Sequence, residues 1–258
     1  MTTVTAEHVA HLRARTGVGI LDAKNALTEA NGNEEAAIEI LRKKGKAQAV
    51  KKADRAQGEG AIFIEASAEK AALVLVRCET DFVARSEKFL GIGKDLTQHL
   101  LTKGKTSFDA YAAEKVPAAV LELGENISVG ETREVAATTI GSYVHSNRKI
   151  GVIVGLDGGT VEQAQDTAMH GAAMNPQFVR PSEVSEAAVA KEKEIWKEQM
   201  KNDKKPAEIL EKIMLGKEKK FREENALLTQ PFVKDQNVTV EKMLGKAQVK
   251  EYVRISLA

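Results

Sequence analysis

Few residues of this 258-residue chain have the types and spacing that covalent chemistry requires. His8 and His11 would share one helix face, but no third ligand follows nearby to complete a metal site. The glycine-rich stretches lack the lysine of a phosphate-binding loop, and no serine lies in a nucleophile elbow. Cys78 is the single cysteine, which excludes an internal disulfide and a thiolate cluster. We therefore expect a protein that acts by binding, not an enzyme.

The polar corner at Thr80 and Asp81 is the strongest candidate for a functional site. Residues 73–76 form an apolar run typical of a buried strand, and apolar residues recur at helical spacing over residues 82–96. Thr80 can therefore cap the new helix, and Asp81 suits the positive end of the helix dipole. From this pattern alone, Phe82 either folds into the core behind an ordinary cap or projects for a function.

Around this corner the string Cys78-Glu79-Thr80-Asp81-Phe82-Val83-Ala84 resembles the hallmark motif of the elongation factor Ts family. That family comprises the bacterial guanine-nucleotide exchange factors that act on elongation factor Tu. Four other segments are similar to the family in the same order: residues 12–24, 124–127, 141–145 and 230–233. The resemblance extends over nearly the whole chain, and five ordered matches are more specific than any single one.

The resemblance implies a function in translation elongation and protein biosynthesis. The chain would bind elongation factor Tu in its GDP-bound and nucleotide-free states, dislodge Mg²⁺, and promote GDP release so that GTP can bind. Displacement of the Mg²⁺ is implied for Thr80, Asp81, Phe82 and Val83, with Phe82 as an apolar wedge. The partner-binding positions implied by the resemblance are Arg13, Ile20, Leu21, Lys24, Leu123, Gly124, His145 and Val233. No cofactor, direct nucleic-acid contact or membrane contact is expected.

For Ile20 and Leu21 the alternative is an ordinary core position, and we expect one of the two to be a core residue. A second alternative concerns the whole chain, because residues 42–55 are strongly basic and could make it an RNA-binding accessory protein. No aromatic residue is interleaved there for base stacking, and the chain has 38 basic against 37 acidic residues. These features favour a solvated linker helix.

The pattern of elements predicts the α+β class. Residues 5–44 indicate three short helices, the third ending at Gly45, and the resemblance implies a ubiquitin-associated-like bundle. Residues 58–180 contain two β-hairpins, each followed by a packing helix, the first helix extending through about Leu101. This weak repeat suggests two related α+β subdomains. Residues 185–225 carry narrow apolar seams on charged helices, which predicts an antiparallel coiled-coil hairpin turning at residues 202–205.

The expected division is an N-terminal three-helix domain (1–45), a basic linker helix (46–57), a first core subdomain (58–140), a second core subdomain (141–184 and 226–258) and the hairpin (185–225). The first residues have neither the basic region nor the apolar region of a signal peptide. No apolar run in the sequence approaches membrane-spanning length. We therefore expect a cytoplasmic protein.

Overall fold

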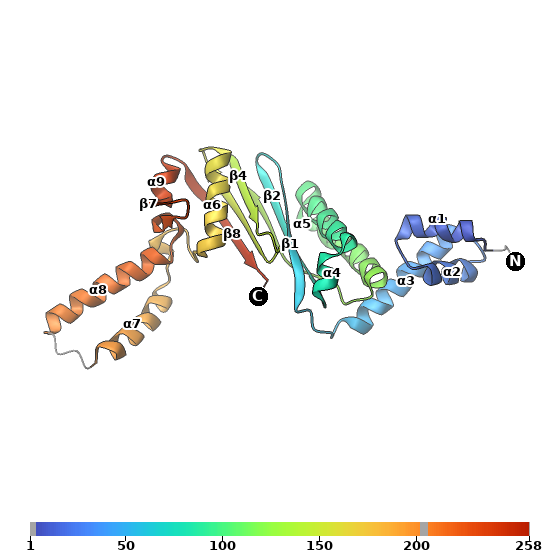
Figure 1. Cartoon of the computed structure of the whole chain (residues 1–258), viewed down its shortest axis with the longest axis horizontal. Helices are drawn as coiled ribbons and strands as arrows, with labels where there is room; N and C mark the ends of the chain where they lie inside the picture. Colours follow the sequence, from blue (N-terminus) through green and yellow to red (C-terminus); the bar gives the residue numbers. More distant parts are fainter. Residues whose placement is uncertain (1–3, 202–205, 258) are drawn as a thin grey trace. The chain divides into compact units, whose positions relative to one another are not determined.

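The computed structural model describes residues 4–201 and 206–257, and these residues form a mixture of helices and small sheets (Figure 1). They fall into two compact units. The first unit comprises Met1–Glu134, Val144–Gly151 and Ile255–Ala258, and the second comprises Val135–Tyr143 and Val152–Arg254. The expected mixed class is confirmed at this level, while the finer division into subdomains stays a prediction. The turn expected at residues 202–205 lies outside the described residues.

Three helices open the first unit: α1 (Ala6–Thr16), α2 (Ile20–Glu29) and α3 (Glu34–Lys52). Thr5 caps α1, since its Oγ1 accepts a hydrogen bond from the His8 backbone N–H at 3.3 Å. Gly17 ends α1 in the left-handed region, with φ of 73°, where a glycine is favoured. The three helices bury a shared apolar cluster that includes Leu12, Leu27 and Leu41.

The expectation that the third helix stops at Gly45 is wrong, because α3 continues to Lys52. Gly45 is buried, and a Cβ built there would lie 2.7 Å from the Pro117 carbonyl oxygen. The missing side chain therefore permits close packing between α3 and a later helix. A glycine that serves packing and one that ends a helix look the same in a local sequence pattern.

The sheet of the first unit has the strand order β1-β2-β3. Its strands are β1 (Glu59–Ala66), β2 (Lys70–Cys78) and β3 (Ser128–Ala136), and β1 pairs with β2 in antiparallel register. The short helix α4 (Asp81–Arg85) follows β2, and α5 (Glu87–Leu123) then covers the β1–β2 hairpin (Figure 1). Phe89, Leu96 and Leu100 of α5 are buried in the same apolar cluster as strand residues of β1 and β2.

The first packing helix is longer than predicted. The helix expected through about Leu101 is interrupted at Gly104, which has φ of 75° and ψ of 173°, and a further helical segment reaches Leu123. The two segments are held together by the stacked rings of His99 and Tyr111, whose centroids lie 3.9 Å apart. The added segment carries Pro117 against α3, which explains why the two helices fit so closely.

Most residues of the sheet of order β4-β5-β8 belong to the second unit, while the turn between β4 and β5 belongs to the first. The strands are β4 (Thr139–Val144), β5 (Ile150–Asp157) and β8 (Gln248–Ser256). Its other elements are α6 (Val161–Met174), 3-10 turns at Pro181–Glu183 and Leu227–Thr229, the two-stranded β6 (Pro231–Phe232) and β7 (Asp235–Thr239), and α9 (Val240–Leu244). Thr160 and Gln163 form a capping box at the start of α6. Tyr252 of β8 packs against Gly171 of α6, so this helix covers the sheet.

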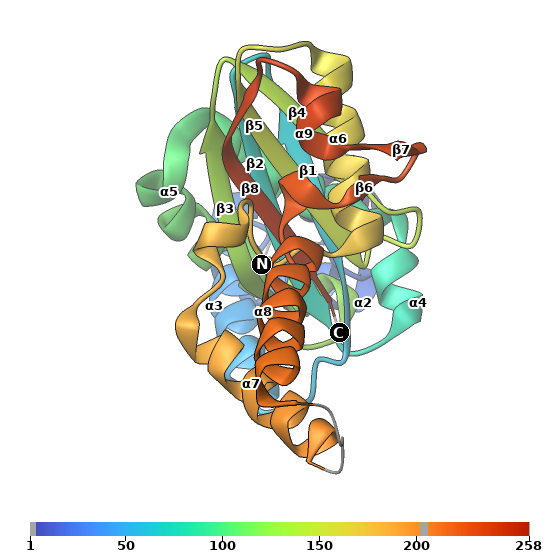
Figure 2. The ribbon, with the colours of Figure 1, turned by 90° about the vertical axis from the view of Figure 1, so that its left-hand side faces the viewer.

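The remaining helices of this unit, α7 (Glu186–Met200) and α8 (Ala207–Glu224), run side by side (Figure 2). The Trp196 ring meets the Phe221 ring edge to face, with centroids 5.9 Å apart. The Lys193 ammonium and the Glu218 carboxylate form an ion pair of 2.7 Å between the helices. The predicted pair of helices with a narrow apolar seam is therefore present. Within the described ranges, no helix is both long enough and apolar enough to cross a bilayer.

Candidate functional site

The corner between β2 and α4 has the geometry of a helix cap. Thr80 is extended, with φ of −122° and ψ of 154°, and its Oγ1 accepts a hydrogen bond from the Val83 N–H at 3.3 Å. Ala84 turns inward and is buried, whereas the Phe82 side chain is 83% exposed. The capping role of Thr80 is confirmed, and the alternative that places Phe82 in the core is wrong. The inward face of this five-residue helix is occupied by Ala84, with Val83 partly buried against the same core.

Asp81 lies beside Phe82 on the outer side of the corner. Its Oδ2 lies 3.1 Å from an Arg85 guanidinium nitrogen, and both side chains are substantially exposed. A solvent-exposed pair of this kind contributes little stability, typically under about 1 kcal/mol. The Asp81 carboxylate is therefore available to exchange Arg85 for another contact.

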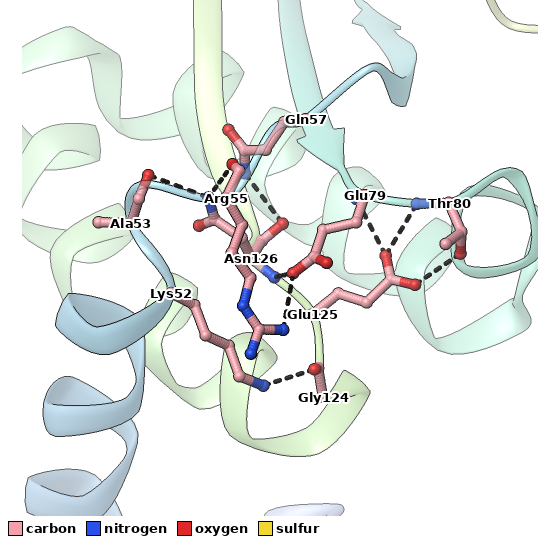
Figure 3. Close-up of polar contacts among 9 residues, drawn as sticks. All are labelled: Lys52, Ala53, Arg55, Gln57, Glu79, Thr80, Gly124, Glu125 and Asn126. Atoms are coloured by element: carbon pink, nitrogen blue, oxygen red, sulfur yellow. Dashed lines mark hydrogen bonds and ion pairs between the residues drawn. The ribbon is translucent and has the colours of Figure 1, made fainter.

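The backbone of the corner is held by two reciprocal glutamates (Figure 3). The Glu125 carboxylate accepts hydrogen bonds from the Glu79 and Thr80 N–H groups at 3.0 and 3.1 Å, and from the Thr80 hydroxyl at 2.5 Å. The Glu79 carboxylate in turn accepts from the Asn126 N–H at 2.6 Å. We refer to Glu79, Glu125 and Asn126 as the corner buttress. Hydrogen bonds to charged groups are among the stronger ones, so the buttress fixes the direction of the corner.

Asn126 connects the buttress to the segment that follows α3. Its side-chain N–H₂ donates to the backbone oxygens of Ala53 at 3.2 Å and Arg55 at 3.0 Å (Figure 3). The backbone carbonyl of Asn126 accepts a hydrogen bond from the Gln57 side-chain N–H₂ at 2.9 Å. Asn126 is buried. A buried amide with these partners fixes how its own segment lies against the corner and against residues 53–57.

A cleft of about 590 Å³ lies beside the corner within the first unit. Asp81 and Arg85 line one side, and Arg148 and Lys149 of the turn between β4 and β5 line another. Arg148 adopts a φ of 56°, and its guanidinium lies over the Phe63 ring at 5.5 Å. The cleft therefore presents charges of both signs next to the exposed aromatic side chain.

His145 lies at the start of that turn and is half-buried, but it is not among the residues that line the cleft. Its Nδ1 lies 2.9 Å from the Asn147 Oδ1, which fixes the ring at the turn. The structure thus brings the segment of His145 close to the corner without placing the imidazole in the cleft.

At the start of α2, Ile20 and Leu21 are 62% and 70% exposed. The expectation that one of them is a core residue is wrong, because the buried face of α2 is formed by Ala23, Ala26 and Leu27. Ile20 and Lys24 of α2 line an open groove of about 420 Å³ together with Arg13 and other residues of α1 and of the segment before it. The structure therefore brings three of the four N-terminal candidate residues together on one groove, while Leu21 lies outside its lining.

The other candidate residues lie apart from that groove. Leu123 is half-buried against the core of the first unit, and Gly124 ends α5 with φ of 77°. The Gly124 carbonyl accepts a hydrogen bond from the Lys52 ammonium (Figure 3). Val233 belongs to the second unit, where it follows β6 and is 37% exposed.

Cys78 and the histidines show no arrangement for covalent chemistry. The Cys78 thiol is buried and donates to the Thr80 carbonyl at 3.2 Å, and burial raises its pKa to about 11. A thiol with that pKa stays protonated near neutral pH and is a poor nucleophile. Over residues 4–201 and 206–257, no cluster of three His, Cys, Asp or Glu side chains could hold a metal ion. His11 instead pairs with Glu34 at 2.9 Å.

Several of the basic side chains at residues 42–55 have protein partners. Arg42 pairs with Glu114 at 2.8 Å, Lys43 with Glu39 at 2.9 Å, Arg55 with Glu79 at 3.4 Å, and Lys44 with Asp22. Each pair reduces the positive charge offered to a phosphate backbone. The RNA-binding alternative stays a prediction, and these contacts favour the interpretation of a surface helix.

Glu125 was missed as a site residue by the sequence analysis, although it lies in the matched segment 124–127. An acidic residue that follows a helix-ending glycine is a visible signal, but nothing in the sequence shows which N–H groups it meets. Its three donors come from residues 45 and 46 positions earlier in the chain. Arg148 was missed for a similar reason, because its place in the same cleft as Asp81 depends on tertiary packing.

Comparison with known proteins gives a consistent result. The family described as Elongation factor TS matches residues 79–258. Elongation factor Ts of Hahella chejuensis is 43% identical over 253 residues, which cover 96% of this chain and 88% of that protein. Elongation factor Ts of Aeromonas salmonicida is 42% identical over 269 residues, which cover 100% of this chain and 92% of that protein. The same factor of Francisella tularensis subsp. novicida is 40% identical, with coverage of 100% and 93%.

These matches identify the class of the protein as a translation elongation factor, a component of protein biosynthesis. The family is equally clear, since the family match covers well over half of the chain and the relatives align over nearly all of it. The chain belongs to the elongation factor Ts family.

Proposed function

We propose that this chain is a guanine-nucleotide exchange factor without covalent chemistry, which binds elongation factor Tu and accelerates the release of GDP. The observation that carries the proposal is the exposed Phe82 side chain on a corner fixed by Thr80 and Glu125. A large aromatic side chain on a rigid support loses little conformational entropy when it inserts into a partner. It is therefore suited to displace structure in another protein.

The proposed mechanism acts on the Mg²⁺ that the partner holds with its nucleotide. Mg²⁺ requires near-octahedral oxygen ligands, so a small displacement of its surroundings weakens its binding. Phe82 is the apolar wedge, and the exposed Asp81 carboxylate disturbs the polar surroundings of the ion. Thr80 and Val83 shape the corner through their hydrogen bond. Loss of the ion removes a major counter-charge of the phosphates, so GDP leaves faster and GTP can bind.

The remaining candidate residues are proposed to hold other faces of elongation factor Tu, in its GDP-bound and nucleotide-free states. The groove with Arg13, Ile20 and Lys24 offers an apolar surface with a positive rim, and the exposed Leu21 adjoins it along α2. Leu123, Gly124, His145 and Val233 are proposed as further contacts. The α7–α8 hairpin is proposed as an additional arm that strengthens partner binding.

The domain organisation expected from the sequence is likewise proposed. The shared apolar cluster of α1, α2 and α3 supports a ubiquitin-associated-like N-terminal bundle. The pairing of β1 with β2 before α5, and of β4 with β5 before α6, supports two related subdomains with the α7–α8 hairpin inserted in the second.

The test is release of a fluorescent GDP analogue from elongation factor Tu with and without this protein. We expect the wild-type chain to accelerate release and Phe82→Ala to remain near the uncatalysed rate. A parallel gel-shift titration with RNA at several salt concentrations examines the alternative, since phosphate contacts give a steep salt dependence. An unchanged GDP release rate together with salt-sensitive RNA binding would overturn the proposal.

A further inference from the structure

A buried histidine that the proposed mechanism does not use lies directly behind Val233. His170 is on α6 in the second unit and is fully buried. Its Nε2 lies 2.9 Å from the Gln230 Oε1, and the Val233 backbone N–H donates to its Nδ1 at 3.2 Å. The ring therefore joins α6 to both ends of the segment Gln230 to Val233, with the Phe232 ring 6.1 Å away.

These contacts define one protonation state of the imidazole. The Gln230 side-chain N–H₂ donates to the Glu224 carbonyl at 2.7 Å, which turns its Oε1 toward the histidine as an acceptor. The proton must therefore reside on Nε2, since two acceptors cannot share a hydrogen bond. Nδ1 then carries the lone pair that the Val233 N–H requires. His170 is held as the neutral Nε2–H tautomer by partners on both ring nitrogens.

A second proton would break this arrangement. Protonated Nδ1 is a donor, and it would face the N–H donor of Val233 in a buried site. Burial lowers the pKa of the His170 imidazole below its ordinary value, and the hydrogen bond with Gln230 offsets part of this effect. The neutral ring is therefore the form that the fold favours.

Several charged groups on the neighbouring elements have partners of their own. On α6 itself, Asp166 pairs with Lys234, which lies between β6 and β7, at 2.6 Å. On α8, the Glu224 carboxylate pairs with Lys220 at 3.5 Å. Asp235 lies in β7, where its Oδ1 accepts hydrogen bonds from Asn237. Tyr252 of β8 packs against Gly171, which follows His170, and Arg254 lies two residues further along the same strand.

We propose that His170 is a positioning residue for Val233, and that a proton on His170 and elongation factor Tu at Val233 exclude each other. This inference rests on the proposed function, because it takes Val233 as a partner contact. Linkage makes the effect reciprocal: the factor by which the proton weakens partner binding is the factor by which the partner weakens proton binding.

The direction of the pH dependence follows from the lowered pKa. The pKa of this histidine is lower in the folded protein than in the unfolded chain, where it is about 6.5. Its neutral form therefore stabilises the fold, and this contribution is complete above about pH 6.5. The contribution is lost as the pH falls from about 6.5 toward the folded pKa. The turn at Val233 is therefore expected to be closed at neutral pH and to lose stability as the pH falls below about 6.5.

Two neutral substitutions separate the two ring nitrogens. The Asn side chain of His170→Asn places an acceptor oxygen near the position of Nδ1, so the bond from the Val233 N–H is kept without a titrating group. The longer side chain of His170→Gln reaches the position of Nε2 and leaves the Val233 N–H without its acceptor. Each variant loses the hydrogen bond at one of the two ring nitrogens. If His170 only stabilised the fold, both variants would therefore lose stability to a similar extent.

The partner-free measurement is hydrogen exchange at the Val233 amide, together with ¹⁵N NMR of the His170 ring in the wild-type protein. We expect an Nε2–H ring at pH 7.5, with Val233 protection that falls toward pH 5.5. His170→Asn should keep its protection over the same range, and His170→Gln should lack it throughout. A wild-type ring protonated on Nδ1, or equal protection in both variants at every pH, would overturn the inference.

The binding measurement is the dissociation constant with elongation factor Tu at pH 7.5 and 5.5. Each variant is compared with wild type at the same pH, so that titration of the partner cancels. Loss of one hydrogen bond predicts a roughly five- to tenfold larger loss of affinity on acidification for wild type than for His170→Asn. Equal losses would overturn the inference while leaving the exchange function intact. Absence of wild-type binding at pH 7.5 would instead count against the proposed function, and with it the exclusion between proton and partner.

Discussion

At the scale of single residues, two phenylalanines on successive helices have opposite environments. Phe82 of α4 projects into solvent, whereas Phe89 of α5 is fully buried and packs near Phe63, with ring centroids 6.1 Å apart. The hydrophobic effect explains Phe89 without any reference to function. It does not explain Phe82, since an exposed aromatic side chain contributes little to folding.

This contrast gives the first prediction. Phe82→Ala should change the free energy of unfolding by less than about 0.5 kcal/mol, as surface substitutions do. Phe89→Ala, the matched control, should lower it by roughly 3–5 kcal/mol through the cavity it leaves. Urea denaturation measures both variants, and the acceleration of GDP release from elongation factor Tu should be lost in Phe82→Ala. If that variant unfolds as easily as the control, Phe82 is a core residue and not a wedge.

Glu125 gives a second prediction at the same scale. Three donors converge on its carboxylate, whereas the neutral amide of Glu125→Gln offers one acceptor oxygen for the two N–H groups and turns an N–H₂ group toward the Thr80 hydroxyl, which must then accept. We expect the free energy of unfolding to fall by about 1 kcal/mol, because neutral hydrogen bonds replace bonds to a charged group. Nucleotide exchange should slow as well, because the corner that carries Phe82 is loosened.

The control for Glu125 is Glu131→Gln, which removes an exposed carboxylate paired with Arg133 on the surface of β3. A surface pair of this kind contributes under about 1 kcal/mol, so this variant should behave nearly as wild type. Equal stability and equal exchange activity in both variants would show that the buttress does not hold the corner.

At the scale of elements, the spacing of apolar residues predicted the helices and strands whose position depends on local burial. The strand before Thr80, the helices α1, α2, α7 and α8, and the cap at Thr80 all follow from apolar spacing and cap chemistry. The extension of α3 beyond Gly45 and the second segment of α5 could not be predicted. Both depend on how two distant helices pack, and the signal is a close approach between Gly45 and Pro117 rather than a local pattern.

The same division applies to the candidate site. Thr80 and Asp81 could be found because a strand and a helix meet there in the sequence. The contacts of Glu125 with Glu79 and of His170 with Val233 could not, since their sequence separations of 46 and 63 residues leave no local trace. Polar networks of this kind are set by tertiary structure and appear only when the chain is folded.

Gly45 gives the prediction at this scale. Replacing a helical glycine by alanine usually stabilises a protein by about 0.5–1 kcal/mol. Gly91→Ala in α5 should follow this rule, because open space surrounds the new methyl group. Gly45→Ala should instead destabilise by roughly 1–3 kcal/mol, because its methyl group would clash with a backbone carbonyl. Urea midpoints of the two variants should move in opposite directions, and a shift of both to higher urea would refute the packing explanation.

At the scale of the whole molecule, the α7–α8 hairpin has its own apolar seam at Trp196 and Phe221. Replacing residues 188–224 with a short Gly/Ser linker should therefore leave the rest of the chain folded and able to promote some exchange, with weaker partner binding. Circular dichroism melting and GDP release measure the two effects. Loss of cooperative melting would mean that the hairpin is part of a core and not a separate arm.

The last prediction treats the protein and its partner as one thermodynamic system. If this chain and GDP favour incompatible arrangements of elongation factor Tu, each weakens the binding of the other by the same factor. Excess GDP with Mg²⁺ should then raise the dissociation constant of the protein pair, and removal of Mg²⁺ should lower it. A protein with equal affinity for both arrangements shifts neither, so a passive scaffold would give a constant value. Isothermal titration at several GDP and Mg²⁺ concentrations measures this dependence. Phe82→Ala serves as the control, because loss of the wedge should reduce the coupling while the groove with Ile20 still binds.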